Sequence, residues 1–429
     1  MYRRLTRPVW LASLLVAALL ACLVGAAAAE QKVVRWRFWG GAAEWEKNEA
    51  IAEAFEARRP DIDVQLELHT DGNYHDKILV ELIAGVAPDI FVVHHLLATT
   101  FHSAGVLVDL YPWLERAGDD YDVDDIFPSL LKAMERSGEL TALPTGFTTM
   151  QVWFNKTMFN EVGVPFPYDR WNWERLRAEA RKFVRDADGD GTADRWGLAI
   201  NRGYEFLTPW IGANHGRTVD DVDNPTRILL DTPNVRETIQ FLYDLIHVDL
   251  VAAPPSAGGG HNLFYNAQIA MWPYYFDAYR YQTYVGDQFE WDVAPFFEGY
   301  HGPAPHPLMA GGLTMSRNSP NPEAAWDFLK FITSAEGDRI SMAYAPAIPV
   351  RRSTMLDFLS DPAPPANKRI YAEILEPGLN APWERFNRWL EYNTVINEEF
   401  APMWEGRISV NAAIENAKRR GEALLFGER

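Results

Sequence analysis

Residues 33–93 alternate short strands with amphipathic helices, and this order constrains the fold more than any other feature of the chain. The segments "VVRWRF" (33–38) and "DIDVQLEL" (61–68) alternate apolar and polar residues, as half-buried strands do. Between them, "EKNEAIAEAFEARRP" places Ile51, Ala54 and Phe55 on one helical face and ends at Pro60. "YHDKILVELIAGVAP" repeats the helical pattern before the strand "DIFVV" (89–93). This order predicts a largely parallel sheet with helices on both faces.

The loops that follow these three strands are the first candidate binding region. In parallel α/β sheets, ligands bind at the carboxyl ends of the strands. The corresponding segments here are "WGGAAEW" (39–45), "HTDGNY" (69–74) and "HHLLATT" (94–100). They combine flat aromatic rings with side chains that form hydrogen bonds.

Length and charge restrict the class of protein. A chain of 429 residues is too long for one typical core, so two lobes or domains are expected. The formal net charge of −19 argues against nucleic acid or an anionic membrane surface as a partner, and weakly against a strongly anionic ligand. Sixteen Trp residues are unusually many and favour stacking surfaces.

The first 29 residues have the pattern of an export signal. Three arginines precede the apolar run 9–24, and Ala27–Ala29 form a small-residue cleavage site before Glu30. A second interpretation is a lipoprotein signal at "LLAC", with a lipid anchor on Cys22. Because Cys22 is the only cysteine, the exported chain has no disulfide and no cysteine metal site.

The stretch "NAQIAMWPYYFDAYRYQTY" (266–284) is densely aromatic. Core packing is the common role of such residues, but tyrosine hydroxyls need partners when buried. A dense run of tyrosines therefore also suits the wall of a half-wet site. Trp272, Tyr274 and Tyr275 are predicted to form such a wall.

Five further segments occur in order: "GVAPDIFVVH", "LPTGFTTMQVWFNKTMFNEVGVPFP", "WNWERL", "NAQIAMWPYY" and "GGLTMSRNSPNPEAAWDFLKFITSAEGDR". Together they resemble the extracellular solute-binding protein family of ABC sugar importers, which contains maltose-, trehalose- and glycerol-phosphate-binding proteins. The resemblance covers residues 33–340 and is weaker in the C-terminal tail.

This resemblance implies a two-lobed α/β fold of the periplasmic-binding-protein type (type II-like). Each lobe is expected to be a mainly parallel sheet flanked by helices, with hinge strands between the lobes. The expected division is a signal peptide (1–29), the first part of lobe 1 (30–143), the first part of lobe 2 (144–305), a return to lobe 1 (306–346), and lobe 2 with C-terminal helices (347–429).

The resemblance also implies that the two lobes close on a ligand held between them, and it indicates which residues bind that ligand. A pyranose has apolar C–H faces and a polar rim, so its site needs aromatic faces and a few fixed polar groups. The residues expected to bind the ligand are Trp39, Gly40, Glu44, Asp71, His94, His95, Thr148, Trp272, Tyr274, Tyr275, Gly311 and Gly312. One departure from the family is that Phe264–Gln268 replaces its usual Phe-x-x-Gly-Lys.

The segment "DADGDGTAD" (186–194) suggests a calcium loop, with Asp186, Asp188, Asp190 and Asp194 as ligands. Gly197 stands where an EF-hand would place its glutamate, and the alternative is a solvated acidic turn. No cofactor other than this structural calcium is expected.

The function implied by the resemblance is the substrate-binding component of an ABC importer. It would capture a neutral mono-, di- or oligosaccharide and deliver it to the membrane permease as a periplasmic monomer, without catalysis. The chain has no P-loop, His-Glu-x-x-His or Gly-x-Ser-x-Gly motif. Two alternatives stay open: an exported carbohydrate-cleaving enzyme with an aromatic cleft, and a sugar-presenting partner of a chemoreceptor.

Overall fold

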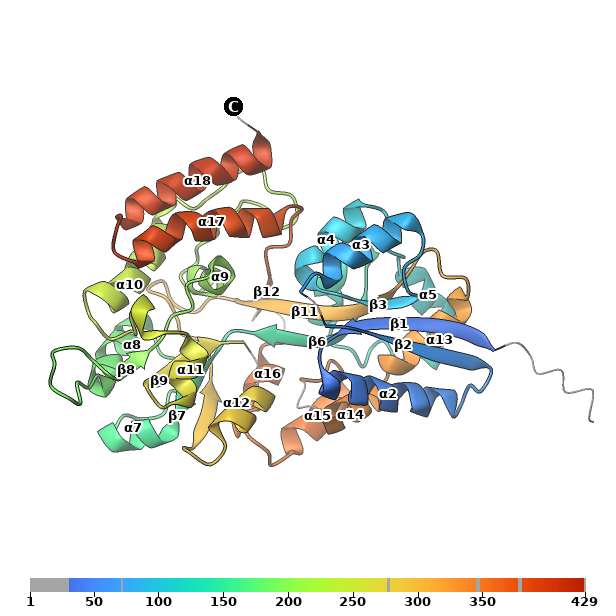
Figure 1. Cartoon of the computed structure of the whole chain (residues 1–429), viewed down its shortest axis with the longest axis horizontal. Helices are drawn as coiled ribbons and strands as arrows, with labels where there is room; N and C mark the ends of the chain where they lie inside the picture. The colour runs from blue at the N-terminus through green and yellow to red at the C-terminus, as the bar shows by residue number, and fades with distance from the viewer. Residues whose placement is uncertain (1–30, 71, 276–277, 345–347, 377–379, 428–429) are drawn as a thin grey trace, which may run out of the picture.

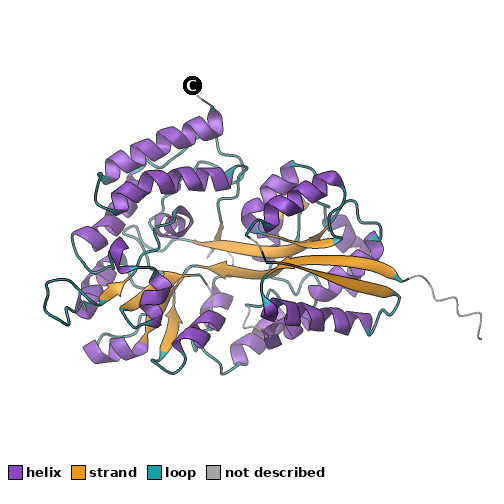
Figure 2. Ribbon diagram, viewed as in Figure 1, coloured by secondary structure: helices purple, strands orange, loops and turns teal. Residues whose placement is uncertain are grey.

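The computed structural model describes residues 31–70, 72–275, 278–344, 348–376 and 380–427. The chain forms two lobes side by side, and long strands run between them (Figure 1). Each lobe has strands at its centre and helices around them (Figure 2). Among the described residues, no helix combines the length and apolar character needed to cross a membrane.

The first lobe contains the N-terminal strands and most of the helices between residues 42 and 134. Its strands are β1 (Lys32–Trp39), β2 (Ile62–His69), β3 (Ile90–Val93), β4 (Glu135–Arg136), β5 (Glu139–Leu140), β6 (Leu143–Thr149), β11 (His306–Met315) and β12 (Asn380–Pro382). Its helices are α2 (Ala42–Glu56), α3 (Tyr74–Ala84), α4 (His95–Ser103), α5 (Tyr111–Ala117), η1 (Gly118–Asp120), α6 (Pro128–Met134), α13 (Pro322–Ile332), α14 (Ala335–Tyr344) and α15 (Arg352–Ser360). Helix α16 (Arg369–Glu373) lies between the lobes, where Ile370 and Ile374 line a cavity together with Phe296 of the second lobe (Figure 1).

The second lobe contains the middle of the chain and its C-terminal helices. Its strands are β7 (Gln151–Asn155), β8 (Trp196–Leu198), β9 (Ile269–Tyr274) and β10 (Trp291–Ala294). Its helices are α7 (Lys156–Val162), α8 (Trp173–Ala180), η2 (Arg181–Phe183), α9 (Tyr204–Ala213), α10 (Pro233–His247), η3 (Pro255–Ala257), α11 (Gly260–Tyr265), α12 (Ala278–Val285), α17 (Trp389–Trp404) and α18 (Val410–Phe426).

The sheet of the first lobe follows the predicted order at its N-terminal end. β1 pairs in parallel with both β2 and β3. The alternation in β1 buries Val34, Trp36 and Phe38, and the helical pattern of α2 buries Ile51 and Phe55. Because these strands are parallel, their carboxyl ends lie at one edge of the sheet, where the predicted binding loops begin.

Strand β11 ties this sheet to the segments that cross between the lobes. It pairs antiparallel with β3 and β6 and parallel with β12. Gly311 lies opposite Gly146 of β6, and the register shifts between Gly311 and Gly312. β6 continues directly into β7 of the second lobe, so one extended segment serves both sheets (Figure 1).

The sheet of the second lobe is mixed rather than mainly parallel. β7 pairs antiparallel with β9 and β10, and only β8 and β9 are parallel. The fold class is as predicted, while the strand directions of this lobe differ.

The return of the chain to the second lobe also differs from the predicted boundary at residue 347. Arg351 donates to the carbonyls of Thr333 and Asp122, both at 2.7 Å, and Met355 is buried in the core that β1 and β3 share. Residues 348–360 therefore pack on the first lobe. The later crossing segment is β12, which pairs with the start of β11.

Candidate functional site

The first-lobe half of the candidate site surrounds Trp39 at the carboxyl end of β1. The Trp39 ring is half-buried and lies 4.9 Å from Tyr74, 5.1 Å from His75 and 6.4 Å from His94, measured between ring centroids. Tyr74 is anchored by its hydroxyl oxygen, which accepts a hydrogen bond from the backbone N–H of Val92 at 3.0 Å. The ends of β1 and β3 and the start of α3 thus form one aromatic and imidazole cluster.

The imidazoles of this cluster are neutral over the usual pH range. Burial lowers the pKa of His75 to about 4, and burial together with the neighbouring His75 lowers the pKa of His94 to about 4. The rings lie 6.0 Å apart. A neutral imidazole offers one donor and one acceptor, which suits the hydroxyl groups of an uncharged ligand.

Gly40 lies between β1 and α2, whereas the later part of the predicted loop 39–45, with Glu44, belongs to α2. Gly40 has φ +148°, and a Cβ at this position would lie 2.6 Å from Cβ of Glu44. Only glycine fits this close approach without displacing the helix start. Glu44 lies in the first turn of α2 and forms an ion pair with Lys47.

The crossing strands form the region between the two halves. Thr148 pairs with Met309, and Val93 pairs with Gly312. Because β3 and β11 are antiparallel, His94, the residue after Val93, lies opposite Gly311. A Cβ at Gly312 would lie 2.4 Å from the Leu143 carbonyl, whereas one at Gly311 would meet nothing within 4 Å. Gly312 is therefore needed for strand packing, and Gly311 leaves open space beside His94.

The second-lobe half lies at the carboxyl end of β9. Tyr274 stacks on Phe206 at 5.2 Å with 17° between the rings, and Tyr275 lies 4.9 Å from Phe206. The Tyr275 hydroxyl donates to the Glu205 carbonyl at 3.2 Å. Tyr274 pairs with Gln151, three residues along the chain from Thr148, which is roughly 10 Å of extended strand.

Trp272 differs from the predicted open wall. Its side chain is 2 % exposed, it stacks on Tyr274 with 11° between the rings, and the backbone of Gly260 covers its six-membered ring. A Cβ at Gly260 would lie 2.2 Å from that ring. The indole nitrogen is buried without a hydrogen-bond partner among the described residues. In this structure Trp272 is a packing residue beneath Tyr274.

The sequence prediction did not include Arg202 and Glu205, which flank the second-lobe aromatic residues. Arg202 precedes α9 and Glu205 lies in its first turn, after the strand β8 that runs parallel to β9. Both are half-buried, and within the described residues neither side chain forms a hydrogen bond or an ion pair. Burial lowers the pKa of Arg202 and raises that of Glu205. The signal was available in "NRGYEF" (201–206), which follows a parallel strand. Tyr74 and His75 were likewise missed.

Asp71 and the side chain of His95 lie outside the described part of the chain, although the backbone of His95 begins α4.

The predicted calcium loop is an exposed turn in which three of the four aspartates converge. Carboxylate oxygens of Asp186, Asp188 and Asp194 lie within 4.8 Å of one another, and Asp190 is outside this group. The Asp186 carboxylate already accepts the backbone N–H groups of Gly189 and Gly191, at 2.7 and 2.9 Å. These bonds account for the turn without an ion, so calcium binding stays a prediction.

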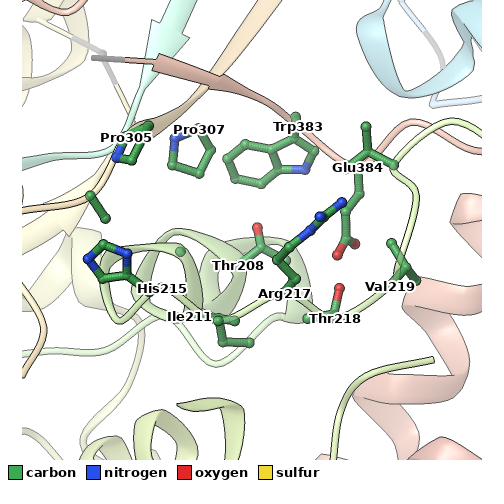
Figure 3. A pocket seen from close by; sticks show the side chains of 14 residues that line it. Thr208, Ile211, His215, Arg217, Thr218, Val219, Pro305, Pro307, Trp383 and Glu384 are labelled. Carbon is green, nitrogen blue, oxygen red and sulfur yellow. The ribbon is translucent and has the colours of Figure 1, made fainter. Parts of the chain in front are cut away.

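A pocket of about 340 Å³ lies elsewhere in the second lobe (Figure 3). The side chains that line it include those of Thr208, Ile211, Arg217, Pro307, Trp383 and Glu384. Burial raises the pKa of Glu384 to about 7. None of the residues predicted to bind a ligand lines this pocket.

The sequence of this chain matches the family model described as "Bacterial extracellular solute-binding protein" over residues 44–339, more than half of its length. The chain belongs to this family. The sn-glycerol-3-phosphate-binding periplasmic protein UgpB of Yersinia pseudotuberculosis is 20 % identical over 395 residues, which are 88 % of each chain.

Two solved structures show the same fold at low identity. The ABC substrate-binding protein of Listeria monocytogenes in complex with cycloalternan has a TM-score of 0.79 and 21 % identity, and the match covers 93 % of this chain and all of that one. The GacH receptor of Streptomyces glaucescens, solved without ligand and with acarbose, has a TM-score of 0.73 and 20 % identity, with the same coverage. Both matches extend the two-lobed architecture over nearly the whole described chain.

Proposed function

We propose that this protein is the substrate-binding component of an ABC importer and captures a neutral carbohydrate between its two lobes. The observation that carries the proposal is the placement of two half-sites, Trp39 with His75 and His94 in one lobe and Tyr274 with Phe206 in the other, at strand ends on either side of the crossing strands. Aromatic faces pack on sugar C–H groups, and neutral imidazoles bond hydroxyls.

The relatives support a carbohydrate or polyol as the ligand class. One is named for sn-glycerol-3-phosphate, and the structural neighbours hold cycloalternan and acarbose. A neutral ligand fits this chain because its formal net charge is −19 and the first-lobe cluster consists of neutral rings. In this proposal the exported protein acts as a periplasmic monomer, hands its ligand to a membrane permease and performs no catalysis.

The test is a thermal-shift screen of the exported form, residues 30–429, against neutral mono-, di- and oligosaccharides, followed by calorimetric titration of the hits. A ligand at 100 times its dissociation constant adds about 2.7 kcal/mol of stability. Trp39→Ala should abolish or strongly weaken binding.

The control for this variant is Trp113→Ala, which removes another half-buried tryptophan of the first lobe, packed on Trp326 and away from both half-sites. The affinity of Trp113→Ala for the carbohydrate found in the screen should equal that of the unchanged protein. Release of reducing ends from the bound oligosaccharide, lost when one carboxylate is changed, would identify an enzyme and overturn the proposal.

A further inference from the structure

The pocket in the second lobe is separate from the proposed carbohydrate site between the lobes. Helix α9 contributes Thr208, Ile211 and Gly212, which share one face of the helix by their spacing. Phe206, which packs on Tyr274 and Tyr275, is two residues from Thr208 and so points about 200° away around the helix. The helix thus stands between Phe206 and the part of the pocket that Thr208 lines, while Trp383 of the pocket wall lies 6.0 Å from Tyr275 of the half-site.

A buried carboxyl group and an arginine lie side by side in the wall of this pocket (Figure 3). Glu384 is 8 % exposed, and its Oε2 accepts from the Tyr204 hydroxyl at 2.9 Å and from the Trp389 indole N–H at 3.3 Å. Its Oε1 has no hydrogen bond within the described residues. Arg217 donates to the Asp220 carbonyl at 2.7 Å, and its guanidinium lies beside Glu384 and Trp383 (Figure 3). Hydrogen-bonding capacity of both groups is therefore left for a bound molecule.

The remaining wall is largely apolar. Ile211, Val219, Val222, Pro305 and Pro307 surround the two polar groups. Because burial raises the pKa of Glu384 to about 7, the carboxyl group and the guanidinium together carry at most one net charge. This weak charge and the apolar wall favour an uncharged molecule with apolar faces and several hydroxyls. A single sugar ring or cyclic polyol has this chemistry, and the volume of about 340 Å³ admits it.

The pocket is built from two of the segments that connect the lobes. Ala304 and Pro305 precede β11, Pro307 lies at its start, and Trp383 and Glu384 follow β12. We infer that this hinge pocket is a second binding site of the protein, distinct from the interlobe site, for one neutral sugar or cyclic polyol ring held by Glu384 and Arg217.

Gly212 allows the pocket to be filled without disturbing the helix. A Cβ at this position meets only Pro307, at 3.7 and 3.9 Å, which is ordinary contact. Gly212→Met therefore extends a side chain into the pocket, and Gly212→Ala makes the same helical change while adding only a methyl group. The two variants form a matched pair.

The experiment titrates the exported form with D-glucose, D-galactose and myo-inositol by calorimetry, with hydrogen exchange of residues 214–222 as the local readout. At least one probe should protect this segment in the unchanged protein and in Gly212→Ala, and Gly212→Met should remove the protection. Arg217→Met should weaken the affinity for this probe about tenfold, because it removes one charge-assisted hydrogen bond to the bound molecule. Trp39→Ala should leave it unchanged.

Equal protection in Gly212→Met and Gly212→Ala would overturn the assignment, as would protection that disappears in Trp39→Ala. Absence of protection by all three probes would overturn the ligand class, and so would protection by L-leucine alone, since a zwitterion could span the same carboxyl and guanidinium. Because the readout depends on Gly212 and Arg217, it stands whether or not a carbohydrate binds between the lobes.

Discussion

Replacing Trp272 by alanine separates packing from ligand binding in the aromatic stretch. The indole is 2 % exposed, stacks on Tyr274 and lies against Gly260, so its removal leaves a sealed cavity. A buried tryptophan truncated to alanine costs about 3–5 kcal/mol. The unpartnered indole N–H disappears with the side chain, which returns about 1 kcal/mol. The expected loss in the free energy of unfolding is therefore about 3 kcal/mol.

Thermal melting of the ligand-free protein measures this loss, which corresponds to a decrease of roughly 6–12 °C for a lobe of this size. Calorimetric titration of the remaining folded protein should give a nearly unchanged affinity. Trp272→Phe keeps a ring against Gly260 and removes the unpartnered N–H, so it should cost less than half as much. Trp39→Ala should show the opposite pattern, with reduced affinity and a small change in melting temperature.

The opposite outcome for Trp272→Ala would refute this reasoning. An unchanged melting temperature with a 30-fold loss of affinity, about 2 kcal/mol, would mean that the indole is a binding surface.

Three further predictions concern the histidine cluster, the aspartate turn and the first loop. The pKa of His75 is about 4 in the folded protein and near 6.5 in the unfolded chain, so between these pH values only the unfolded chain binds the proton. Relative to His75→Gln, the free energy of unfolding of the unchanged protein should therefore fall by about 1.4 kcal/mol per pH unit as the pH drops from 6.5 to 4. Urea unfolding at a series of pH values measures this slope. Ligand affinity should stay flat from pH 8 to pH 5, and a step near pH 6.5 would contradict neutral His75 and His94. Calcium at a concentration on the order of millimolar should raise the melting temperature, and Asp188→Asn should remove that increase. If calcium does not shift the melting temperature of the unchanged protein, the turn binds no calcium and is a solvated acidic turn. Gly40→Ala should lower both the melting temperature and the affinity for the carbohydrate, because the added Cβ displaces the start of α2. A melting temperature and an affinity equal to those of the unchanged protein would show that the segment between β1 and α2 accommodates the Cβ.

The N-terminal half of the first sheet could be predicted from the sequence because its information is local. The alternation that buries Val34, Trp36 and Phe38 lies within one strand, and the helical spacing of Ile51 and Phe55 lies within one helix. The loops at the ends of these strands follow from topology, and Trp39 at the end of β1 lies 6.4 Å from His94 after β3, measured between ring centroids.

The remaining features depend on contacts between distant residues. The composition of the stretch 266–284 shows many aromatic rings, but the cover over Trp272 comes from Gly260, on another element. β12 has three residues and no alternation, so its pairing with β11 leaves no local pattern. His75 lies in the first turn of α3, where helical spacing does not reveal that its ring turns toward Trp39 at the end of β1.

The pairing of β11 with β3 bears on how the chain reaches its native state. Val93 pairs with Gly312, more than two hundred residues later, so the first lobe cannot be completed from the N-terminal third of the polypeptide. Until β11 is available, one edge of β3 stays unpaired and open to other strands. Such long-range closure slows folding and prolongs exposure to aggregation. The first lobe therefore completes its sheet late, only after residues 306–315 have become available.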